Sequence, residues 1–257
     1  MKVAVSGIGG RMGRLVAEAV AAAEDLELVA GYDPARAGSE IAGVRVSTSP
    51  DELGAADVVV EFTLPDVVMG NLRRWRRLGL DAVVGTSGFD EERLAALATE
   101  WGPEGGRCLV VPNFSIGAVV MMHLAEVAAR HFAAAEIVEL HHDRKADAPS
   151  GTATATAARI GAAGAQRRDV ESTELVPGVR GGRIADVPVH SVRLPGLVAH
   201  QMVILGNRGE TLTIRHDTTD REAFLPGVLL AVRGISGLPP GVTVGLESLL
   251  GIGGSGR

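Results

Sequence analysis

The densest group of potentially reactive side chains lies between Glu136 and Ala153, where the chain reads EIVELHHDRKADAPSGTA. Two adjacent histidines, a lysine and a Pro-Ser-Gly-Thr turn follow one another in this segment. Histidine titrates near neutral pH and can donate a proton, whereas a lysine ammonium offers a compact positive charge. Lys145 and Lys2 are the only lysines, and every other basic residue apart from histidine is arginine. The segment therefore predicts a site that binds and protonates a small polyanionic molecule.

The position of the two histidines limits how both can reach one ligand. Neighbouring side chains of a strand point to opposite faces, and an alternating apolar run leads up to His141. From Asp143 onward the chain reads as a loop, so we expect the strand to end at the histidine pair. Either His141 or His142 can then face a reacting centre as a proton donor, while the other orients it or grips the substrate.

Beyond this loop, the sequence predicts the start of a helix that can bind an anion. Pro149 comes directly before Ser150, Gly151 and Thr152, and the N-terminus of a helix favours a negative charge. No G-x-S-x-G elbow surrounds Ser150, so we interpret this serine as an N-cap rather than a nucleophile. The histidine pair lacks the usual spacing of metal ligands, and we expect no metal.

A second candidate site lies near the N-terminus, where a strand, a glycine-rich loop and a helix follow one another. The loop carries Gly7, Gly10 and Gly13 with the spacing GxxGxxG. Glycine lets the backbone turn tightly and approach a pyrophosphate, and the helix N-terminus supplies N–H groups. Asp33 lies twenty residues beyond Gly13, at the end of the next predicted strand. The combination predicts dinucleotide binding rather than an ordinary turn.

The choice between NAD and NADP stays open on these residues. Asp33 can accept hydrogen bonds from the ribose hydroxyls, which favours NAD. Arg11, Arg14 and Arg36 can neutralise a 2′-phosphate, which favours NADP.

Two later loops at predicted strand ends extend this second site. They are the segments 85–88 (GTSG) and 112–115 (PNFS). Open α/β sheets bind ligands at the carboxyl ends of their strands, so we expect these loops to contact the nicotinamide half of the cofactor.

The elements around these residues are those of an α/β protein. In the first half, short β-branched runs alternate with helical patterns, which indicates βαβ units and a parallel sheet. Strands are predicted at 3–6, 28–32, 57–62, 82–85 and 109–111, and helices at 11–23, 67–78 and 91–101. After Pro112, a long helical pattern precedes alternating runs that indicate a mixed or antiparallel sheet. These later segments are a helix at 116–132, strands at 187–194, 198–205 and 211–216, a mobile loop at 162–182 and a final helix at 221–235.

Composition limits the classes of function. At 257 residues, of which 46% are apolar, the chain can form one large domain or two modest ones. The net charge of −6 argues against a nucleic-acid or membrane-surface binder, and no apolar run approaches the ~20 residues of a membrane span. The lone Cys108 fits a reducing compartment. The N-terminal segment runs directly into the glycine loop without the apolar core of a signal peptide, so we expect a cytoplasmic protein.

The run HHDRKADAPSGTA resembles the signature of the dihydrodipicolinate reductase family, and the resemblance extends over almost the whole chain. It includes GIGGRMGR in the first loop, EFT at 61–63, VVGTSGF at 83–89, VPNFSIGA at 111–118 and GETLTIRHD at 209–217. The family's usual GTTG is GTSG here, which keeps the hydroxyl. The family's acidic-then-basic pair after the second strand is Asp33-Pro34 here, which leaves the nucleotide preference open.

The resemblance implies a role for each candidate residue. His141 is the expected proton donor or acceptor, and Lys145 the second catalytic donor. Substrate carboxylates are expected at His142, Ser150, Gly151 and Thr152. NADH or NADPH is expected at Gly7, Ile8, Gly9, Gly10, Arg11, Met12, Asp33, Gly85, Thr86, Ser87, Val111, Pro112, Asn113 and Phe114.

The resemblance also implies the architecture and the assembly. A Rossmann-like parallel-sheet domain, 1–112, binds the dinucleotide, and 218–257 returns to it. An α+β domain with a mixed or antiparallel sheet, 113–217, binds the substrate and forms a homotetramer. All seven histidines lie between Ile116 and Asp217, which favours a separate chemical domain there.

The implied reaction is the reduction of 4-hydroxy-tetrahydrodipicolinate, or dihydrodipicolinate, to tetrahydrodipicolinate in diaminopimelate and lysine biosynthesis. A hydride adds to a conjugated cyclic imine dicarboxylate, and His141, helped by Lys145, protonates the neighbouring carbon. One alternative is a Rossmann dehydrogenase of an aspartate-family semialdehyde or homoserine, which would not need paired histidines before PSGT. Another is a regulatory protein that senses NAD(P)H without turnover and tolerates the loss of Lys145.

Overall fold

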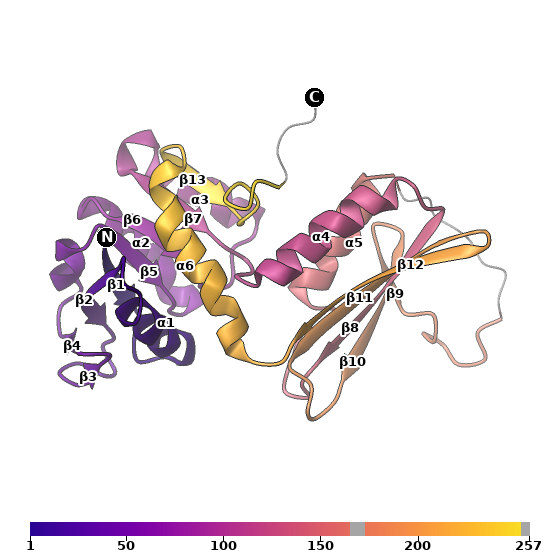
Figure 1. Ribbon diagram of the computed structural model, residues 1–257, viewed down its shortest axis with the longest axis horizontal. Coiled ribbons are helices and arrows are strands. Elements are labelled where there is room, and N and C mark those ends of the chain that lie inside the picture. The colour runs from indigo at the N-terminus through magenta and orange to yellow at the C-terminus, as the bar shows by residue number, and fades with distance from the viewer. Residues whose placement is uncertain (165–172, 253–257) are drawn as a thin grey trace. The chain divides into compact units, whose positions relative to one another are not determined.

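The structure is a computed structural model that describes residues 1–164 and 173–252, and it divides into two compact units (Figure 1). The first unit comprises Met1–Ile116 and Phe224–Arg257, and the second comprises Gly117–Ala223. The chain therefore leaves the first unit once and returns to it. The boundaries expected from the sequence, after residues 112 and 217, lie a few residues from these.

The first unit contains an 8-stranded sheet with the order β13-β7-β6-β5-β1-β2-β4-β3. Its strands pair in parallel, apart from the antiparallel pair β3–β4. This topology confirms the parallel Rossmann-like sheet predicted from the sequence. The strands are β1 Lys2–Ser6, β2 Glu27–Tyr32, β3 Glu40–Ile41, β4 Val44–Ser47, β5 Val58–Glu61, β6 Asp81–Val84, β7 Arg107–Val110 and β13 Gly241–Val244. The α-helices are α1 Arg11–Ala21, α2 Pro65–Arg77, α3 Glu91–Trp101 and α6 Leu225–Gly234, with 3-10 helices at Pro50–Ala55, Pro103–Gly105 and Ile235–Gly237.

Helices cover both faces of this sheet, because the strand side chains alternate between two apolar clusters. Val3 and Val5 pack with residues of α1 and α6, whereas Ala4 packs with residues of α2 and α3. All four residues of β5 are buried, as its continuous valine run predicts for a strand covered on both faces. Since β1, β5, β6 and β7 are parallel, their carboxyl ends lie along one edge of the sheet.

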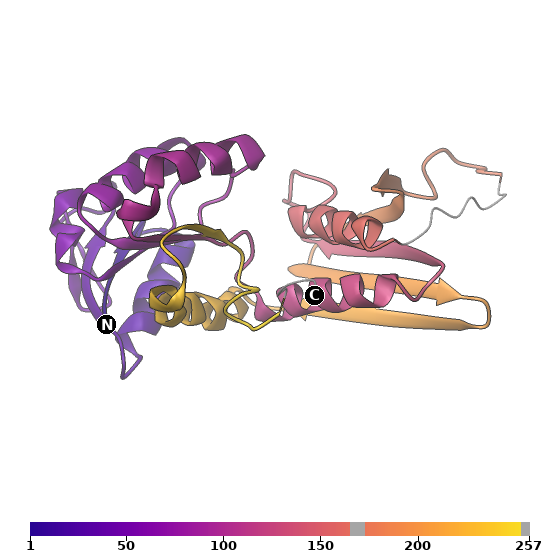
Figure 2. The ribbon, with the colours of Figure 1, turned by 90° about the horizontal axis from the view of Figure 1, so that it is seen from above.

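The second unit contains a 5-stranded sheet with the order β12-β11-β8-β10-β9. Strands β8 and β10 are parallel and the other pairs are antiparallel, which confirms the predicted mixed sheet. Helices α4 and α5 pack on one face through a cluster that includes Ile137 of β8, and Figure 2 shows both helices running along the strands. The elements are α4 Ile116–Ala129, β8 Ala134–His141, α5 Gly151–Ala162, β9 Gly182–Ile184, β10 Val187–Arg193, β11 Ala199–Asn207, β12 Glu210–Thr218 and a 3-10 helix at Arg221–Phe224.

Two predicted segments differ from the structure or extend beyond it. The final helix was predicted from residue 221, but α6 begins at Leu225 after a 3-10 turn. Pro226 explains this start, because proline fits the first turn of an α-helix and would break one that began earlier. Of the mobile loop predicted at 162–182, residues 165–172 lie outside the described part of the chain.

Two properties of the described residues bear on the classes considered above. Cys108 is buried, and burial raises the pKa of its thiol, as expected for an inert cysteine. Within residues 1–164 and 173–252, no helix has the length and apolar character needed to cross a membrane.

Candidate active site

The glycine loop between β1 and α1 is shaped for the close approach of a ligand. Gly7 has a φ of +79°, and a Cβ at this position would lie 2.2 Å from the carbonyl oxygen of Phe62. A Cβ at Gly13 would lie 2.0 Å from the carbonyl oxygen of Gly7. Helix α1 begins after Gly10 without a side-chain cap and without an acidic residue in its first turn. Its N-terminal N–H groups and dipole therefore favour an anion such as a pyrophosphate.

Asp33 and Arg36 flank Gly9 of this loop. The carboxylate of Asp33 accepts hydrogen bonds from the backbone N–H of Gly9 at 3.1 Å and of Ala35 at 2.9 Å. A Cβ at Gly9 would lie 2.5 Å from Cγ of Arg36 and 2.6 Å from Oδ2 of Asp33. Because Gly9 has no side chain, the space between Asp33 and Arg36 stays open. The carboxylate of Asp33 can accept hydrogen bonds from ribose hydroxyls, and the guanidinium of Arg36 can bind a 2′-phosphate. These residues fit a dinucleotide of either kind.

Loops from the neighbouring strands meet at the same edge of the sheet. A Cβ at Gly85, after β6, would lie 2.2 Å from the ring of Phe62, which follows β5. The rings of Phe62 and Phe114 have their centroids 5.5 Å apart. The backbone N–H of Thr63 donates to Oγ1 of Thr86 at 2.9 Å. The three loops after β5, β6 and β7 therefore pack on one another.

The buried carboxylate of Glu61 is hydrogen-bonded to residues of α2 and of these loops. Its Oε2 accepts a hydrogen bond from Nε1 of Trp75 at 2.7 Å, and its Oε1 accepts from Nδ2 of Asn71 at 3.1 Å and from the hydroxyl of Thr63. The hydroxyl of Thr86 donates to the carbonyl oxygen of Glu61 at 3.3 Å. Glu61 thereby connects α2 to the loops after β5 and β6.

The residues predicted to bind the cofactor are Asp33 and members of the loops after β1, β6 and β7. Their side chains differ in accessibility. Ile8 is fully buried, and Thr86, Val111 and Phe114 are also buried. Gly9 is partly exposed and Gly10 and Arg11 are exposed, which leaves accessible backbone at the start of α1.

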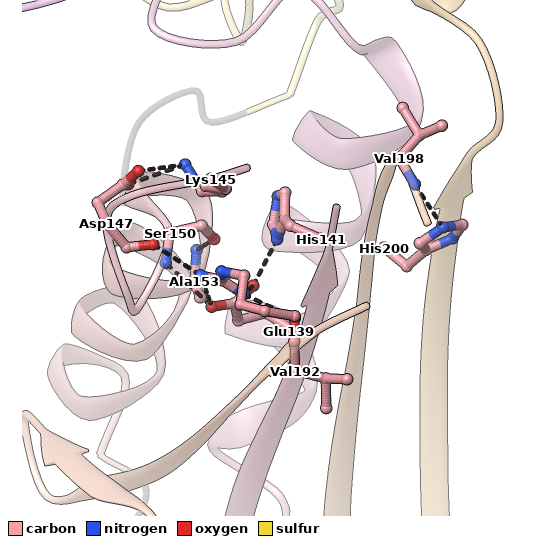
Figure 3. A network of polar contacts seen from close by, with 10 residues as sticks. Glu139, His141, Lys145, Asp147, Ser150, Ala153, Val192, Val198 and His200 are labelled. Carbon is pink, nitrogen blue, oxygen red and sulfur yellow. Dashed lines mark hydrogen bonds and ion pairs between the residues drawn. The ribbon is translucent and has the colours of Figure 1, made fainter. Parts of the chain in front are cut away.

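In the second unit, β8 ends at His141, which confirms the predicted strand end. His141 and Glu139 lie two residues apart on one face of the strand, and Nδ1 of the imidazole is 2.5 Å from Oε2 of the carboxylate (Figure 3). An ionised carboxylate only accepts hydrogen bonds, so Nδ1 carries the hydrogen and Nε2 is the basic nitrogen of the neutral ring.

Burial and neighbouring charges set the ionisation of this pair. Burial acts to raise the pKa of Glu139, but hydrogen bonds from Arg193, Ser191 and His141 outweigh it and hold the pKa below its usual range. Burial lowers the pKa of His141, and the positive charges of Lys145 and Arg193 lower it further, although Glu139 acts in the opposite direction. At neutral pH the carboxylate is therefore ionised and the imidazole is mainly neutral.

Lys145 lies in the loop after β8 and pairs with Asp147. Its Nζ is 2.8 Å from both carboxylate oxygens of Asp147, and its backbone N–H donates to the carbonyl of His142 at 3.2 Å. The side chain of Asp147 is 62% exposed, and exposed ion pairs of this kind are weak. The ammonium can therefore exchange Asp147 for another carboxylate at small cost.

Ser150 caps α5, as predicted. Its Oγ accepts a hydrogen bond from the N–H of Ala153 at 3.2 Å, and its own N–H donates to Oε1 of Glu139 at 3.3 Å. Ser150 is buried, but Gly151 is exposed with open space beside it, and the first turn of α5 has no acidic residue. The backbone at Gly151 and Thr152 can therefore face an anion.

His142 differs from His141 in its surroundings. Its Nδ1 is buried and makes no hydrogen bond to any residue that the structure describes. A buried polar atom without a partner costs free energy, so a ligand group that reached this nitrogen would be bound favourably.

Arg193 and Glu139 belong to this arrangement, although the sequence interpretation did not single them out. Two guanidinium nitrogens of Arg193 lie 2.9 Å and 2.8 Å from the two carboxylate oxygens of Glu139. The sequence held a signal for Glu139, because it precedes His141 by two residues in a strand and so shares its face. It held none for Arg193, which lies opposite His141 on β10, because strand register is not readable from the local sequence.

Over residues 1–164 and 173–252, no group of three or more His, Cys, Asp or Glu side chains could hold a metal ion.

Comparisons with known proteins match the chain over nearly its full length. The family model described as dihydrodipicolinate reductase, N-terminus, matches residues 1–114, and the model described as dihydrodipicolinate reductase, C-terminus, matches residues 117–250. A 4-hydroxy-tetrahydrodipicolinate reductase of Cutibacterium acnes is 51% identical, with 98% of this chain and 99% of the relative covered. One from Thermobifida fusca is also 51% identical, with 98% of this chain and 100% of the relative covered.

A solved structure has a similar fold. It is a dipicolinate-bound dihydrodipicolinate reductase from Paenisporosarcina sp. TG-14, with a TM-score of 0.86 and 34% sequence identity. The match covers 96% of this chain and 98% of that one.

Proposed function

The chain belongs to the dihydrodipicolinate reductase family, and on that premise we propose that it reduces 4-hydroxy-tetrahydrodipicolinate to tetrahydrodipicolinate with NADH or NADPH. The 4-hydroxyl group leaves as water, and the hydride then adds to the conjugated cyclic imine that remains. The reaction is a step of diaminopimelate and lysine biosynthesis. The observation that carries the proposal is the arrangement at the end of β8, where a neutral imidazole, an ammonium and a helix N-terminus lie on consecutive segments of one unit.

The substrate is a small ring with two carboxylates, and the second unit offers two kinds of anion partner. Lys145 supplies an ammonium group, which forms an ion pair with the exposed Asp147 in the structure. The start of α5 at Gly151 and Thr152 supplies backbone N–H groups and the positive end of the helix dipole. His142 offers a further polar atom. The dipicolinate bound by the similar Paenisporosarcina protein is an aromatic ring, but it shares the six-membered nitrogen ring skeleton and the two flanking carboxylates of the substrate, which supports this assignment.

His141 is the proposed proton donor. Because Glu139 holds Nδ1, the proton must leave from Nε2. The ring is mainly neutral in the free protein, since its pKa is lowered by burial and by nearby positive charges. A bound dianion acts in the opposite direction and favours the imidazolium. Substrate binding thus favours protonation of His141. The imidazolium then donates this proton to the carbon next to the one that received the hydride, and Lys145 stabilises the negative charge that develops on the substrate.

The first unit is the proposed cofactor domain. The residues that would hold the dinucleotide are Gly7 to Met12 at the pyrophosphate, Asp33 at the ribose, and the loops 85–87 and 111–114 at the nicotinamide half. A reduced nicotinamide supplies the hydride when it is bound. The chain's own contribution is to orient the dinucleotide on the glycine loop and to keep its loops packed through Phe62 and Glu61.

We also propose a cytoplasmic homotetramer. The face of the second sheet that carries neither α4 nor α5 holds partly exposed apolar residues: Val138, Leu140, Met202 and Ile204. A second copy of the chain could cover this face. The single buried thiol of Cys108 suits a reducing compartment.

The proposed reaction is tested by following oxidation of NADH and of NADPH with substrate made by a coupled synthase. We expect turnover with at least one cofactor and inhibition by 2,6-pyridinedicarboxylate. His141→Ala and Lys145→Ala should each lower kcat by roughly 10²–10⁴-fold, the usual contribution of a positioned proton donor. Near-normal turnover in either variant would contradict the assigned roles.

The matched controls are His131→Ala and Arg144→Ala, because both replace exposed residues of the same unit. Both should retain the activity of the unmodified protein. A protein that binds NAD(P)H without turnover, or that ignores the pyridine dicarboxylate, would contradict the function itself.

A further inference from the structure

Glu139 is a fully buried carboxylate at the centre of the candidate site in the second unit (Figure 3). It lies 2.5 Å from Nδ1 of His141 and accepts a hydrogen bond from the N–H of Ser150 at 3.3 Å. Both of its oxygens also accept hydrogen bonds from Arg193, at 2.9 Å and 2.8 Å. One side chain therefore contacts the proposed proton donor, the cap of the proposed anion site and a cation.

Arg193 extends this contact to the loop that carries Lys145. Its Nη2 donates to the backbone carbonyl of Asp147 at 2.7 Å, and its Nη1 donates to the carbonyl of Val192 at 2.8 Å. Strand register places Arg193 opposite His141 on β10. The guanidinium is thus fixed to β10 at one end and holds the loop after β8 at the other.

Stability alone is a poor reason for such a pair. Removing two charges from water costs several kcal/mol per ion, and well-packed apolar residues are often as stable or more so. The pair does something that an apolar pair cannot do. It fixes which nitrogen of His141 carries the hydrogen, and it connects three segments that are separate in the sequence.

We propose that Glu139 and Arg193 are a positioning pair, which holds the imidazole of His141, the Lys145 loop and the Ser150 cap in the arrangement that the reaction needs. The inference rests on the proposed function and deepens it. Neither residue needs to touch the substrate, because each acts through the groups that do.

The two partners have opposite electrostatic effects on His141, which gives the proposal a signature. The charged groups that face the imidazole are Glu139 on its own strand, Arg193 on β10 and Lys145 in the following loop. Glu139 raises the pKa of His141, whereas Arg193 and Lys145 lower it. Only the imidazolium can donate a proton, so kcat/KM falls as the pH rises through the pKa of His141. Glu139→Gln should therefore move this fall to lower pH, and Arg193→Met should move it to higher pH. If the pair only stabilised the fold, there would be no reason for the pH dependence of kcat/KM to shift in opposite directions in these two variants.

The test measures kcat, KM and pH profiles for Glu139→Gln, Arg193→Met, Arg193→Lys and the double variant Glu139→Gln/Arg193→Met. Each single isostere should lower kcat about 100-fold, as expected when a catalytic histidine loses its orienting carboxylate. Binding of NADH should stay within about threefold of normal, since the cofactor residues are in the other unit. Arg193→Lys should recover part of the activity, because it keeps a charge but loses the bidentate contact.

The double variant keeps the test decisive if a single variant fails to fold. It removes both buried charges at once, so we expect it to fold and still to lack most of its activity. The matched control is Glu136→Gln, which removes the carboxylate that pairs with His190 and Arg180 from the same strand. Glu136 lies on the opposite face of β8 and should leave kcat and the pH limb unchanged.

Failure of this proposal can be told apart from failure of the proposed function. If the unmodified protein does not reduce the substrate, the function is wrong, but ¹⁵N NMR of His141 still reports whether Nδ1 carries the hydrogen and whether Glu139→Gln releases it. If the unmodified protein is active and the double variant turns over at a normal rate, the positioning pair is overturned. Shifts of the pH limb in the same direction for both single variants would overturn it as well.

Discussion

At the scale of single residues, the environment of His141 makes the proton donor depend on the ligand. In the free protein, burial and the neighbouring cations lower the pKa of the imidazole, and Glu139 only partly opposes them. A group in this state is a poor acid until an anion arrives. The same dicarboxylate that Lys145 and the start of α5 attract would then raise the pKa of the donor.

This dependence predicts two different pH limbs. Only the imidazolium can donate a proton, so kcat/KM, which reports the free protein, should fall as the pH rises through a pKa below 6.5. The bound dianion raises that pKa, so the corresponding fall in kcat should come at higher pH. Initial rates at saturating and limiting substrate from pH 5 to 9, about the range of histidine titration, measure both limbs. Coincident limbs would contradict substrate-assisted protonation.

A second prediction at this scale concerns the choice of nucleotide. The side chain of Arg36 lies over Gly9 beside the carboxylate of Asp33, where it can meet a 2′-phosphate but has nothing to bind on an unphosphorylated ribose. Arg36→Ala should raise KM for NADPH about tenfold, the loss of one charge-assisted contact, with little change for NADH. Arg45→Ala, an exposed arginine of the same region, is the control. Equal losses with both cofactors would assign Arg36 to the fold instead.

At the scale of elements, Glu61 connects a strand, a helix and two loops. It is fully buried and accepts hydrogen bonds from donors on α2 and in the loop after β5. Its replacement should therefore disturb the cofactor loops as well as the core. The hydroxyl of Thr86 belongs to the same network, so we expect position 86 to require a side-chain hydroxyl.

Glu61→Gln should destabilise the protein by about 1–3 kcal/mol, because its amide group would place a donor against the donors of Asn71 or Trp75. Denaturant unfolding followed by circular dichroism measures this change, and fluorescence titration should show weaker NADH binding. Glu100→Gln is the control, since it removes a carboxylate from an exposed ion pair with Arg73 and should have a far smaller effect. Equal midpoints for the two variants would refute the connecting role of Glu61.

The elements also show how far the sequence could predict the structure. The periodic helices α1 and α3 and the buried valine run of β5 were predicted within two residues, because these patterns depend on local burial. The short strands β3, β4, β9 and β13 were missed, since they lack the continuous apolar run that marks the equally short β5. Ser150 was readable as a cap from its neighbours. Arg193 was not readable, because its partners come from β8 and only the register of the sheet brings them together.

At the scale of the whole molecule, the two halves of the proposed chemistry belong to different units. The dinucleotide residues are all in the first unit, and the proton donor, ammonium and anion site are all in the second. The chain returns to the first unit from Phe224 onward, which adds α6 and β13 to the sheet domain. The sequence suggested this return only through the family resemblance, since no local pattern marks which sheet a late strand will join.

The second sheet leaves one face for a further role. Helices α4 and α5 cover the side that bears Ile137, Val203 and Leu205. The other side bears Met202 and Ile204, which are only partly buried. Apolar side chains gathered on an uncovered sheet face are typical of an interface between protein chains. The proposed homotetramer would bury them.

Ile204→Glu should therefore break the assembly while leaving each chain folded, because burying an unpaired carboxylate in an apolar interface costs several kcal/mol. Analytical ultracentrifugation should give four chain masses for the unmodified protein and a smaller species for the variant, with an unchanged far-ultraviolet spectrum. Leu212→Glu is the matched control: Leu212 is 39% exposed on β12 but shares the helix-covered face with Leu205. If Ile204→Glu kept the mass of the unmodified protein, or if the unmodified protein were monomeric, the uncovered face would not be the tetramer interface.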